Sequence, residues 1–129
     1  MQYLTLLFFF LTVNSINSDQ LEYLEPKVHS LDNSNPERIL FVGNSYLYYN
    51  DSLHNHVRRM LEESYGREFD KGNYKSVTIS GSRTSHHNID YPLNHENLGA
   101  EKPFELVILQ GGSGESNTLE ERKIFAQET

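Results

Sequence analysis

The chain has 129 residues, about the size of one ordinary domain, and it contains no cysteine. The lack of cysteine excludes a disulfide framework, thiolate metal sites and a cysteine nucleophile. Lys and Arg number 11 and Asp and Glu number 18, a formal net charge of −7. A nucleic-acid partner needs a clustered basic face, so this charge balance argues against one.

The first 18 residues have the pattern of a secretory signal peptide. Residues 3–13 read YLTLLFFFLTV, an uncharged block that is too short to cross a bilayer, because a spanning helix takes about 20 residues. Small polar residues follow, and cleavage after Ser15 or Ser18 fits them, although no Lys or Arg precedes the block. The alternative is a buried strand or an interfacial anchor. We predict a secreted or periplasmic protein without a membrane segment once residues 1–18 are removed.

Residues 19–37 contain Pro26, Pro36 and a patch rich in Ser and Asn, which predicts an exposed lead-in rather than a helix or strand. The folded part, residues 38–129, then begins. Residues 38–42 (RILFV) form a short apolar run that stops at a glycine. Such a run is typical of a strand that is buried on both faces.

A helix is expected next. Asp51 or Ser52 is a candidate N-cap, apolar residues recur at three-to-four spacing, and Gly66 supplies a stop after Tyr65. Opposite charges four residues apart indicate a solvated outer face on this helix, formed by Arg58, Arg59, Glu62 and Glu63.

Two more strands and a final helix complete the order. Residues 75–80 (KSVTIS) alternate and are rich in β-branched side chains, and residues 104–109 (FELVIL) form a second apolar strand. A last helix is predicted after Asn117 or Thr118. Alternation of strands and helices, with Val and Ile in the strands, predicts an α/β protein with a parallel sheet covered by helices on both faces.

Glycine and small polar residues end all three predicted strands, at 43–45 (GNS), 80–82 (SGS) and 110–113 (QGGS). Ligands of parallel α/β sheets bind beyond the carboxyl ends of the strands, so these loops are expected to meet at one functional edge. Ser45 follows a buried strand, where its hydroxyl is presented at the sheet edge and nearby amides can hold an oxyanion. The G-x-S-x-G elbow is not matched, because position 47 is Leu.

Three blocks of this sequence resemble those of the SGNH (GDSL-like) hydrolases. Residues 39–47 (ILFVGNSYL) resemble the first block, an apolar strand followed by Gly-Asp-Ser-Leu, with Asn44 where the family usually has Asp. Residues 77–82 (VTISGS) and 106–113 (LVILQGGS) resemble the second and third blocks. The resemblance covers roughly residues 38–116. It implies a flavodoxin-like three-layer α/β/α fold and hydrolysis of an acyl or acetyl ester, commonly of a carbohydrate or a lipid.

The resemblance also implies roles for single residues. Ser45 would be the nucleophile, and the backbone amides of Ser45 and Gly81 would be two oxyanion donors. The third donor falls on Ser113 if the blocks are aligned without a gap, and Gln110 is the other candidate. No cofactor is implied. Residues expected to line the substrate are Asn44, Tyr46, His86 and His87.

The fourth block of the family, Asp-x-x-His, supplies the base, and nothing after Ser113 resembles it. The chain is therefore expected to be the N-terminal part of a longer protein, with about three strands of the full sheet. Alone it is expected to be inactive, because a serine without a base is a poor nucleophile. His86 and His87 are the histidines to test, since they follow the second block. No His-x-x-x-His or His-Glu-x-x-His pair occurs, so no metal site is predicted.

Two alternatives to a serine esterase stay open. Tyr46, Tyr48 and Tyr49 either line a sugar-binding cleft or are half-buried residues that pack the first helix, and we favour packing. A cleft of tyrosines without a base suits a non-catalytic, secreted carbohydrate-binding module. The other alternative is an inactive fragment that does not fold, because a partial sheet leaves an edge uncovered.

Overall fold

The computed structural model describes residues 29–128, so the predicted signal peptide lies outside the described residues. The strands are β1 (Ile39–Gly43), β2 (Tyr74–Thr78) and β3 (Leu106–Leu109). The longer helical segments are α1 (Ser45–Tyr48), α2 (Leu53–Tyr65), α3 (Asp90–Leu93) and α4 (Leu119–Glu128). Short 3-10 helices cover Lys71–Asn73, Thr84–His86, His95–Leu98 and Ser113–Glu115.

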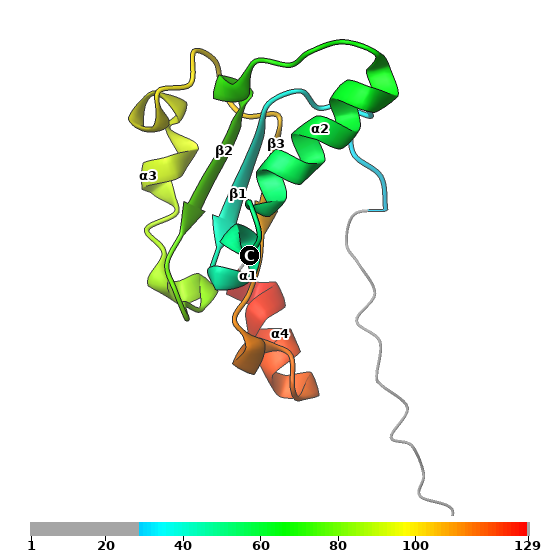
Figure 1. The fold of residues 1–129 in the computed structure, drawn as a ribbon. Helices are drawn as coiled ribbons and strands as arrows, with labels where there is room; N and C mark the ends of the chain where they lie inside the picture. The colour runs from blue at the N-terminus through cyan, green and yellow to red at the C-terminus, as the bar shows by residue number, and fades with distance from the viewer. Residues whose placement is uncertain (1–28, 129) are drawn as a thin grey trace, which may run out of the picture.

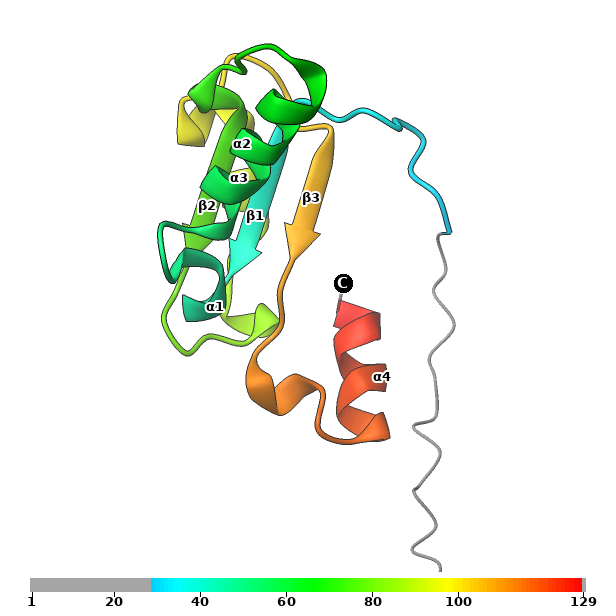
Figure 2. The same ribbon diagram turned by 45° about the vertical axis from the view of Figure 1, so that its right-hand side comes forward.

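The strands form one sheet in the order β2-β1-β3, and both pairs are parallel. Figures 1 and 2 show α2 on one face of this sheet and α3 on the other, with α4 near the carboxyl end of β3. The predicted α/β class, with a parallel sheet and helices on both faces, is confirmed. A central β1 places its carboxyl end between those of its two neighbours, where a ligand can touch all three.

The core is built around β1, whose five residues are all buried. Ile39 and Phe41 point to one face, and Leu40 and Val42 to the other, because side chains alternate along a strand. The prediction of a strand buried on both faces is therefore confirmed. The cluster on the face of Phe41 also includes Leu47, Phe69 and Tyr74, with Val57 and Leu61 of α2 packed against it.

β2 ends two residues before the predicted end, and this part of the prediction was wrong. Its pairing with β1 stops where Gly43 lies opposite Thr78. The amide of Ile79 still donates to the Gly43 carbonyl at 3.0 Å, but the Ile79 side chain is 46% exposed. Gly81 then turns the chain with a φ of +67°. The sheet edge beyond β1 is thus made of loop backbone rather than strand.

The helix α2 ends at Gly66 as predicted, with a left-handed φ of 63° at that glycine. Its start also agrees with the prediction, because Ser52, one of the two candidates, is the N-cap, although neither candidate side chain binds the helix amides. Ser52 occupies the N-cap position without a side-chain bond to the first turn, and Asp51 pairs with Arg59 at 2.7 Å. Asn50, Asp51 and Ser52 have φ angles of 52°, 71° and 63°, a strained conformation for residues other than glycine.

The prediction that charged pairs form a solvated face of α2 was wrong for Arg58 and Glu62. These side chains pair at 2.6 Å and are only 12% and 18% exposed. Glu62 also accepts a hydrogen bond from the Phe69 amide at 3.0 Å. That amide and then the Arg58 guanidinium lower the pKa of Glu62. The pair thus joins α2 to the segment that leads into β2.

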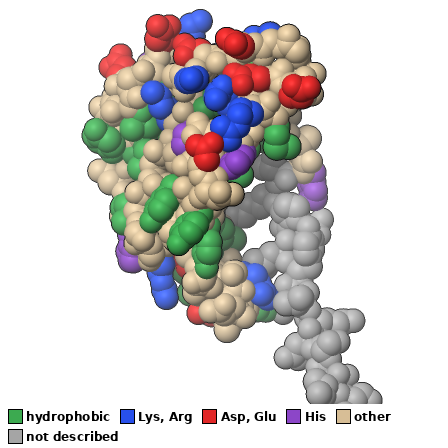
Figure 3. All heavy atoms as spheres, viewed as in Figure 1, with side chains coloured by type: hydrophobic (Ala, Val, Ile, Leu, Met, Phe, Trp, Pro, Cys, Tyr) green, Lys and Arg blue, Asp and Glu red, His purple; other side chains and the backbone are tan. Residues whose placement is uncertain are grey.

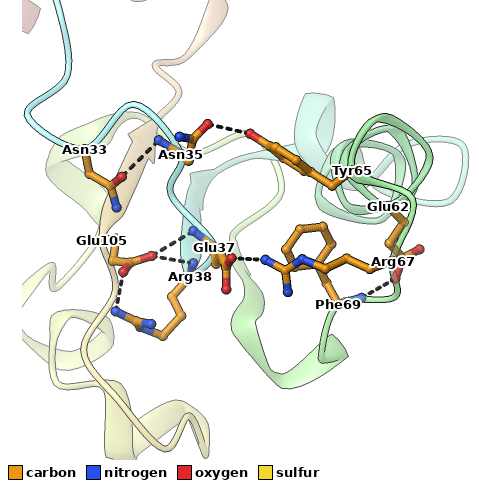
Figure 4. A network of polar contacts seen from close by, with 9 residues as sticks. All are labelled: Asn33, Asn35, Glu37, Arg38, Glu62, Tyr65, Arg67, Phe69 and Glu105. Carbon is orange, nitrogen blue, oxygen red and sulfur yellow. Dashed lines mark hydrogen bonds and ion pairs between the residues drawn. The ribbon is translucent and has the colours of Figure 1, made fainter.

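Polar contacts attach residues 29–37, the described part of the lead-in, to the amino end of the sheet (Figure 4). The Glu105 carboxylate accepts from the amides of Glu37 and Arg38 at 2.7 and 3.1 Å. The first of these bonds is the main reason why the pKa of Glu105 is lowered. Glu37 also pairs with Arg67.

In the described part of the chain, no helix combines the length and apolar character that a membrane span requires.

Candidate functional site

A pocket of about 100 Å³ lies at the carboxyl end of the sheet, where the three strand tips meet. Its lining comes from the loops after β1, β2 and β3 and consists of Asn44, Ser45, Tyr46, Gly81, Ser82, Gly112 and Ser113. The three loops converge as the sequence predicted. Since water takes about 30 Å³ per molecule, the pocket has room for a group the size of an acetyl.

A larger hollow of about 580 Å³ lies beside the end of α2. It is an open surface lined by charged residues and one glycine: Arg59, Glu62, Glu63, Gly66, Arg67 and Glu68. None of these side chains is a suitable nucleophile for acyl transfer. The smaller pocket at the strand tips is therefore the candidate site.

Ser45 is the first residue of α1 and lies half-buried in the pocket wall. Within residues 29–128, neither its hydroxyl nor its backbone N–H has a hydrogen-bond partner. The backbone N–H of Gly81 also has no hydrogen-bond partner within these residues. Its φ of +67° requires glycine, although a Cβ there would meet nothing within 4 Å. The free hydroxyl of Ser45 thus shares the pocket with two unpaired backbone donors.

Asn44 is 2% exposed and connects all three loops. Its Nδ2 donates to the carbonyls of Ser82 and Gly111 at 3.0 and 3.1 Å. Its Oδ1 accepts from the Tyr46 amide at 3.1 Å and so caps α1. Asn44 was expected to line the substrate, and it does line the pocket, but its amide is fully used in holding the loops around Ser45.

The two candidates for the third oxyanion donor lie in different places. Ser113 lines the pocket and begins the 3-10 helix Ser113–Glu115. Gln110 does not line it, because its side chain accepts from the Asn44 amide at 3.2 Å and donates to the Gly111 carbonyl. Of the two, only Ser113 is brought to the pocket.

His86 and His87 were expected to line the substrate, and neither is part of the pocket wall. The Nδ1 of His86 accepts from the Arg83 amide at 3.2 Å. The Nε2 of His87 lies 2.9 Å from the hydroxyl of Ser82. Burial is the largest influence on His87 and lowers its pKa, the Gly43 carbonyl acts in the opposite sense, and His86 lowers it further.

Sequence reasoning missed Ser82 and Glu115. Ser82 is 2% exposed and lines the pocket; its signal in the sequence was a hydroxyl directly after the glycine of the second block. Glu115 is 8% exposed and accepts from the amides of Thr84 and Gly112, so it joins the loops after β2 and β3. Its signal was an acidic residue three positions after a Gly-Gly turn, an arrangement that can cap a short helix.

The interpretation of the three tyrosines as half-buried packing residues was wrong. Tyr46, Tyr48 and Tyr49 are 67%, 41% and 73% exposed. The rings of Tyr48 and Tyr49 are stacked, with centroids 6.2 Å apart and planes inclined by 11°. Figure 3 shows apolar side chains gathered over α1 on this face. Leu47 is the one buried residue of α1.

The described residues contain no group of three or more His, Asp or Glu side chains placed to hold a metal ion. Comparison of the chain with protein-family models, with curated proteins and with solved structures found no match. The geometry of the pocket is therefore the basis for assigning a function.

Proposed function

We propose that the protein is an exported serine esterase of the SGNH (GDSL-like) type, which removes a small acyl group from its substrate through Ser45. One observation carries this proposal: the free hydroxyl of Ser45 shares a pocket of about 100 Å³ with the unpaired amides of Ser45 and Gly81. A hydroxyl nucleophile beside preorganised N–H donors is the arrangement that acyl transfer needs. The parallel sheet with α2 and α3 on opposite faces supports a flavodoxin-like three-layer fold.

In the proposed reaction, the Ser45 hydroxyl oxygen attacks the ester carbonyl carbon as its proton passes to a base, and the carbonyl electrons move onto oxygen. The base returns that proton to the alcohol oxygen when the bond to the alcohol breaks. The amides of Ser45 and Gly81 stabilise that oxyanion, and Ser113 is placed to donate a third hydrogen bond. The alcohol leaves, and water then hydrolyses the acyl-enzyme. Each oxyanion donor of this kind contributes about 10²–10³ in kcat.

The surroundings of the pocket favour a carbohydrate ester as substrate. Tyr46 lines the pocket, and the stacked pair of Tyr48 and Tyr49 follows on the same short helix. Aromatic faces stack on the apolar faces of sugar rings, and exposed tyrosines offer such faces at small entropic cost. The small pocket would accept the acetyl group while the sugar lies on the tyrosines.

The test is hydrolysis of p-nitrophenyl acetate and of an acetylated oligosaccharide by a full-length homologue. Ser45→Ala is expected to abolish the activity, since it removes the atom that forms the acyl bond. Ser64→Ala is the matched control, because Ser64 is an exposed serine on α2 away from the pocket. Retained hydrolysis in Ser45→Ala would contradict the role of Ser45.

A carbohydrate-binding module without catalysis is the second candidate, and the exposed stack of Tyr48 and Tyr49 is the observation that favours it. Titration of the chain with oligosaccharides separates the two functions. Binding that is lost in Tyr49→Ala, together with no hydrolysis of any acetyl ester, would support the module. Hydrolysis that depends on Ser45 would support the esterase.

A further inference from the structure

We propose that Glu115 is the positioning residue for the oxyanion donors. Its buried carboxylate holds the loops after β2 and β3 in the places where their free N–H groups meet a bound acyl group. This inference rests on the proposed function of the pocket in acyl transfer. It assigns a role to a buried ionisable side chain that the acyl-transfer step alone leaves unused.

The contacts of Glu115 join two loops that are distant along the chain. The residue is only 8% exposed. Its Oε1 accepts from the Thr84 amide at 3.2 Å, in the loop after β2, and its Oε2 accepts from the Gly112 amide, in the loop after β3. The Glu115 amide in turn donates to the Gly112 carbonyl at 2.9 Å. Glu115 therefore binds both backbone polar groups of the residue that precedes Ser113.

The same two loops are in close contact beside the carboxylate. A Cβ on Gly112 would lie 3.1 Å from Oε2 of Glu115 and 3.0 Å from the Ser82 carbonyl oxygen. Asn44 also binds both loops, through the carbonyls of Ser82 and Gly111. The loops are thus connected through their carbonyls by an amide side chain and through their amides by a carboxylate.

The charge of Glu115 makes its connection the stronger of the two. In residues 29–128 its carboxylate forms no ion pair, and backbone N–H groups bind it instead. A buried charge needs such donors, because leaving it unsatisfied in a protein interior is costly. Hydrogen bonds to an ionised group are about twice as strong as those between neutral groups. Moving either loop away from the carboxylate is therefore unfavourable.

The loops that Glu115 connects bring free donors to the pocket. The backbone N–H groups of Gly81 and Ser113 have no hydrogen-bond partner within the described residues, and both residues line the pocket. Ser113 directly follows Gly112 in the chain, and Gly81 lies three residues before Thr84. Each donor is therefore close in the chain to an amide that the carboxylate binds. Donors that are fixed before the charge develops stabilise an oxyanion without having to reorganise.

The experiment titrates the full chain with acetate, the acyl product of the proposed reaction, and follows the NMR shifts of single amides. In the wild-type chain, the N–H signals of Ser45, Gly81 and Ser113 should move together and give one dissociation constant. Glu115→Gln keeps the size of the side chain but leaves one acceptor oxygen in place of two. We expect this variant to bind acetate about tenfold more weakly, the effect of losing one hydrogen bond to a charged ligand. Removal of a negative charge alone would strengthen the binding of an anion, so the direction of the change separates positioning from charge.

Glu63→Gln is the matched control, because it removes the same charge from an exposed position on α2 and should leave acetate binding unchanged. Equal or tighter binding in Glu115→Gln than in wild type would overturn the positioning role and leave the esterase proposal standing. No movement of the three amides in the wild-type chain would overturn both. Where Glu115→Gln loses its cooperative unfolding transition, hydrogen exchange in the wild-type chain decides. Acetate should slow the exchange of the Thr84 and Gly112 amides, and unchanged exchange of both would overturn the role.

Discussion

Asn44 shows how one buried side chain can determine the shape of this site. Its amide nitrogen satisfies two carbonyls from two different loops, and its oxygen caps the helix that carries Ser45. A buried carbonyl that loses its donor costs about 1–3 kcal/mol. The position therefore needs a residue that donates and accepts at once, and a carboxylate cannot donate.

Asn44→Asp is expected to destabilise the fold by about 1–3 kcal/mol for each carbonyl left without a donor. The new carboxylate keeps the acceptor for the Tyr46 amide but turns its second oxygen toward the carbonyls of Ser82 and Gly111. The measurement is the free energy of unfolding in urea. Asn117→Asp is the control, because Asn117 lies exposed between β3 and α4. Equal stability of Asn44→Asp and wild type would show that the hydrogen bonds from Asn44 to the Ser82 and Gly111 carbonyls do not stabilise the fold.

At the scale of elements, the tip of β1 is packed so closely that its last residue has to be glycine. A Cβ on Gly43 would lie 2.8 Å from Cδ1 of Leu47 and 2.9 Å from Cβ of Gln110. These neighbours belong to α1 and to the end of β3, so an added methyl group would push the two loops apart. Gly66 differs, since a Cβ there would meet nothing within 4 Å and only its positive φ resists substitution.

Gly43→Ala is expected to cost about 1–3 kcal/mol of stability through overpacking and to slow hydrolysis as well, because Ser45 moves with the strand tip. Gly66→Ala is the matched control and should cost about 1–2 kcal/mol from its left-handed φ while leaving hydrolysis unchanged. Urea unfolding and ester hydrolysis measure the two effects. Full hydrolysis in Gly43→Ala would show that the tip tolerates displacement.

Local sequence signals predicted the elements well because each has a local cause. Apolar runs that end at glycine found the strands, and Gly66 marked the end of α2. Thr118, one of two predicted caps for the last helix, does cap it: its hydroxyl accepts from the Glu121 amide at 3.2 Å, and the Glu121 carboxylate accepts from the Thr118 amide at 2.9 Å.

The features that the sequence did not predict depend on contacts between segments that are distant along the chain. Helical periodicity could not reveal that Glu62 meets the Phe69 amide, because that bond depends on how the chain returns after Gly66. Likewise, nothing next to Tyr49 shows whether another segment covers it, and the described structure leaves it 73% exposed. The convergence of the three loops followed from the parallel topology, but the bond between Ser82 and His87 depended on the path of one loop.

For the whole molecule, half-buried histidines link stability to pH. The ring of His54 packs 6.3 Å from that of Phe41, and its Nδ1 is buried without a partner. Burial is the main cause that lowers the pKa of His54, as it does for His87. Below the ordinary value of 6.5 the unfolded chain therefore binds more protons than the folded chain. Their contribution to stability is complete above that pH and is lost as the pH falls toward the lowered values.

We expect the melting temperature to fall between about pH 7 and pH 5, and His54→Phe to make this fall shallower, since phenylalanine keeps the packing without a site for a proton. A further loss should begin below the ordinary glutamate value of 4.5, because the pKa values of Glu62 and Glu105 are lowered in the fold and the unfolded chain therefore binds more protons there. Thermal melts over this pH range test both. An unchanged slope in His54→Phe would contradict the first, and no cooperative transition at any pH would support the interpretation as a fragment that does not fold.

The most direct test of the account is a crystal structure of the full chain after reaction with a methyl fluorophosphonate. We predict a covalent bond from phosphorus to the Ser45 hydroxyl oxygen, with the phosphoryl oxygen about 2.7–3.1 Å from the amide nitrogens of Ser45 and Gly81. An adduct on another residue, or a phosphoryl oxygen directed into solvent away from both amides, would contradict it.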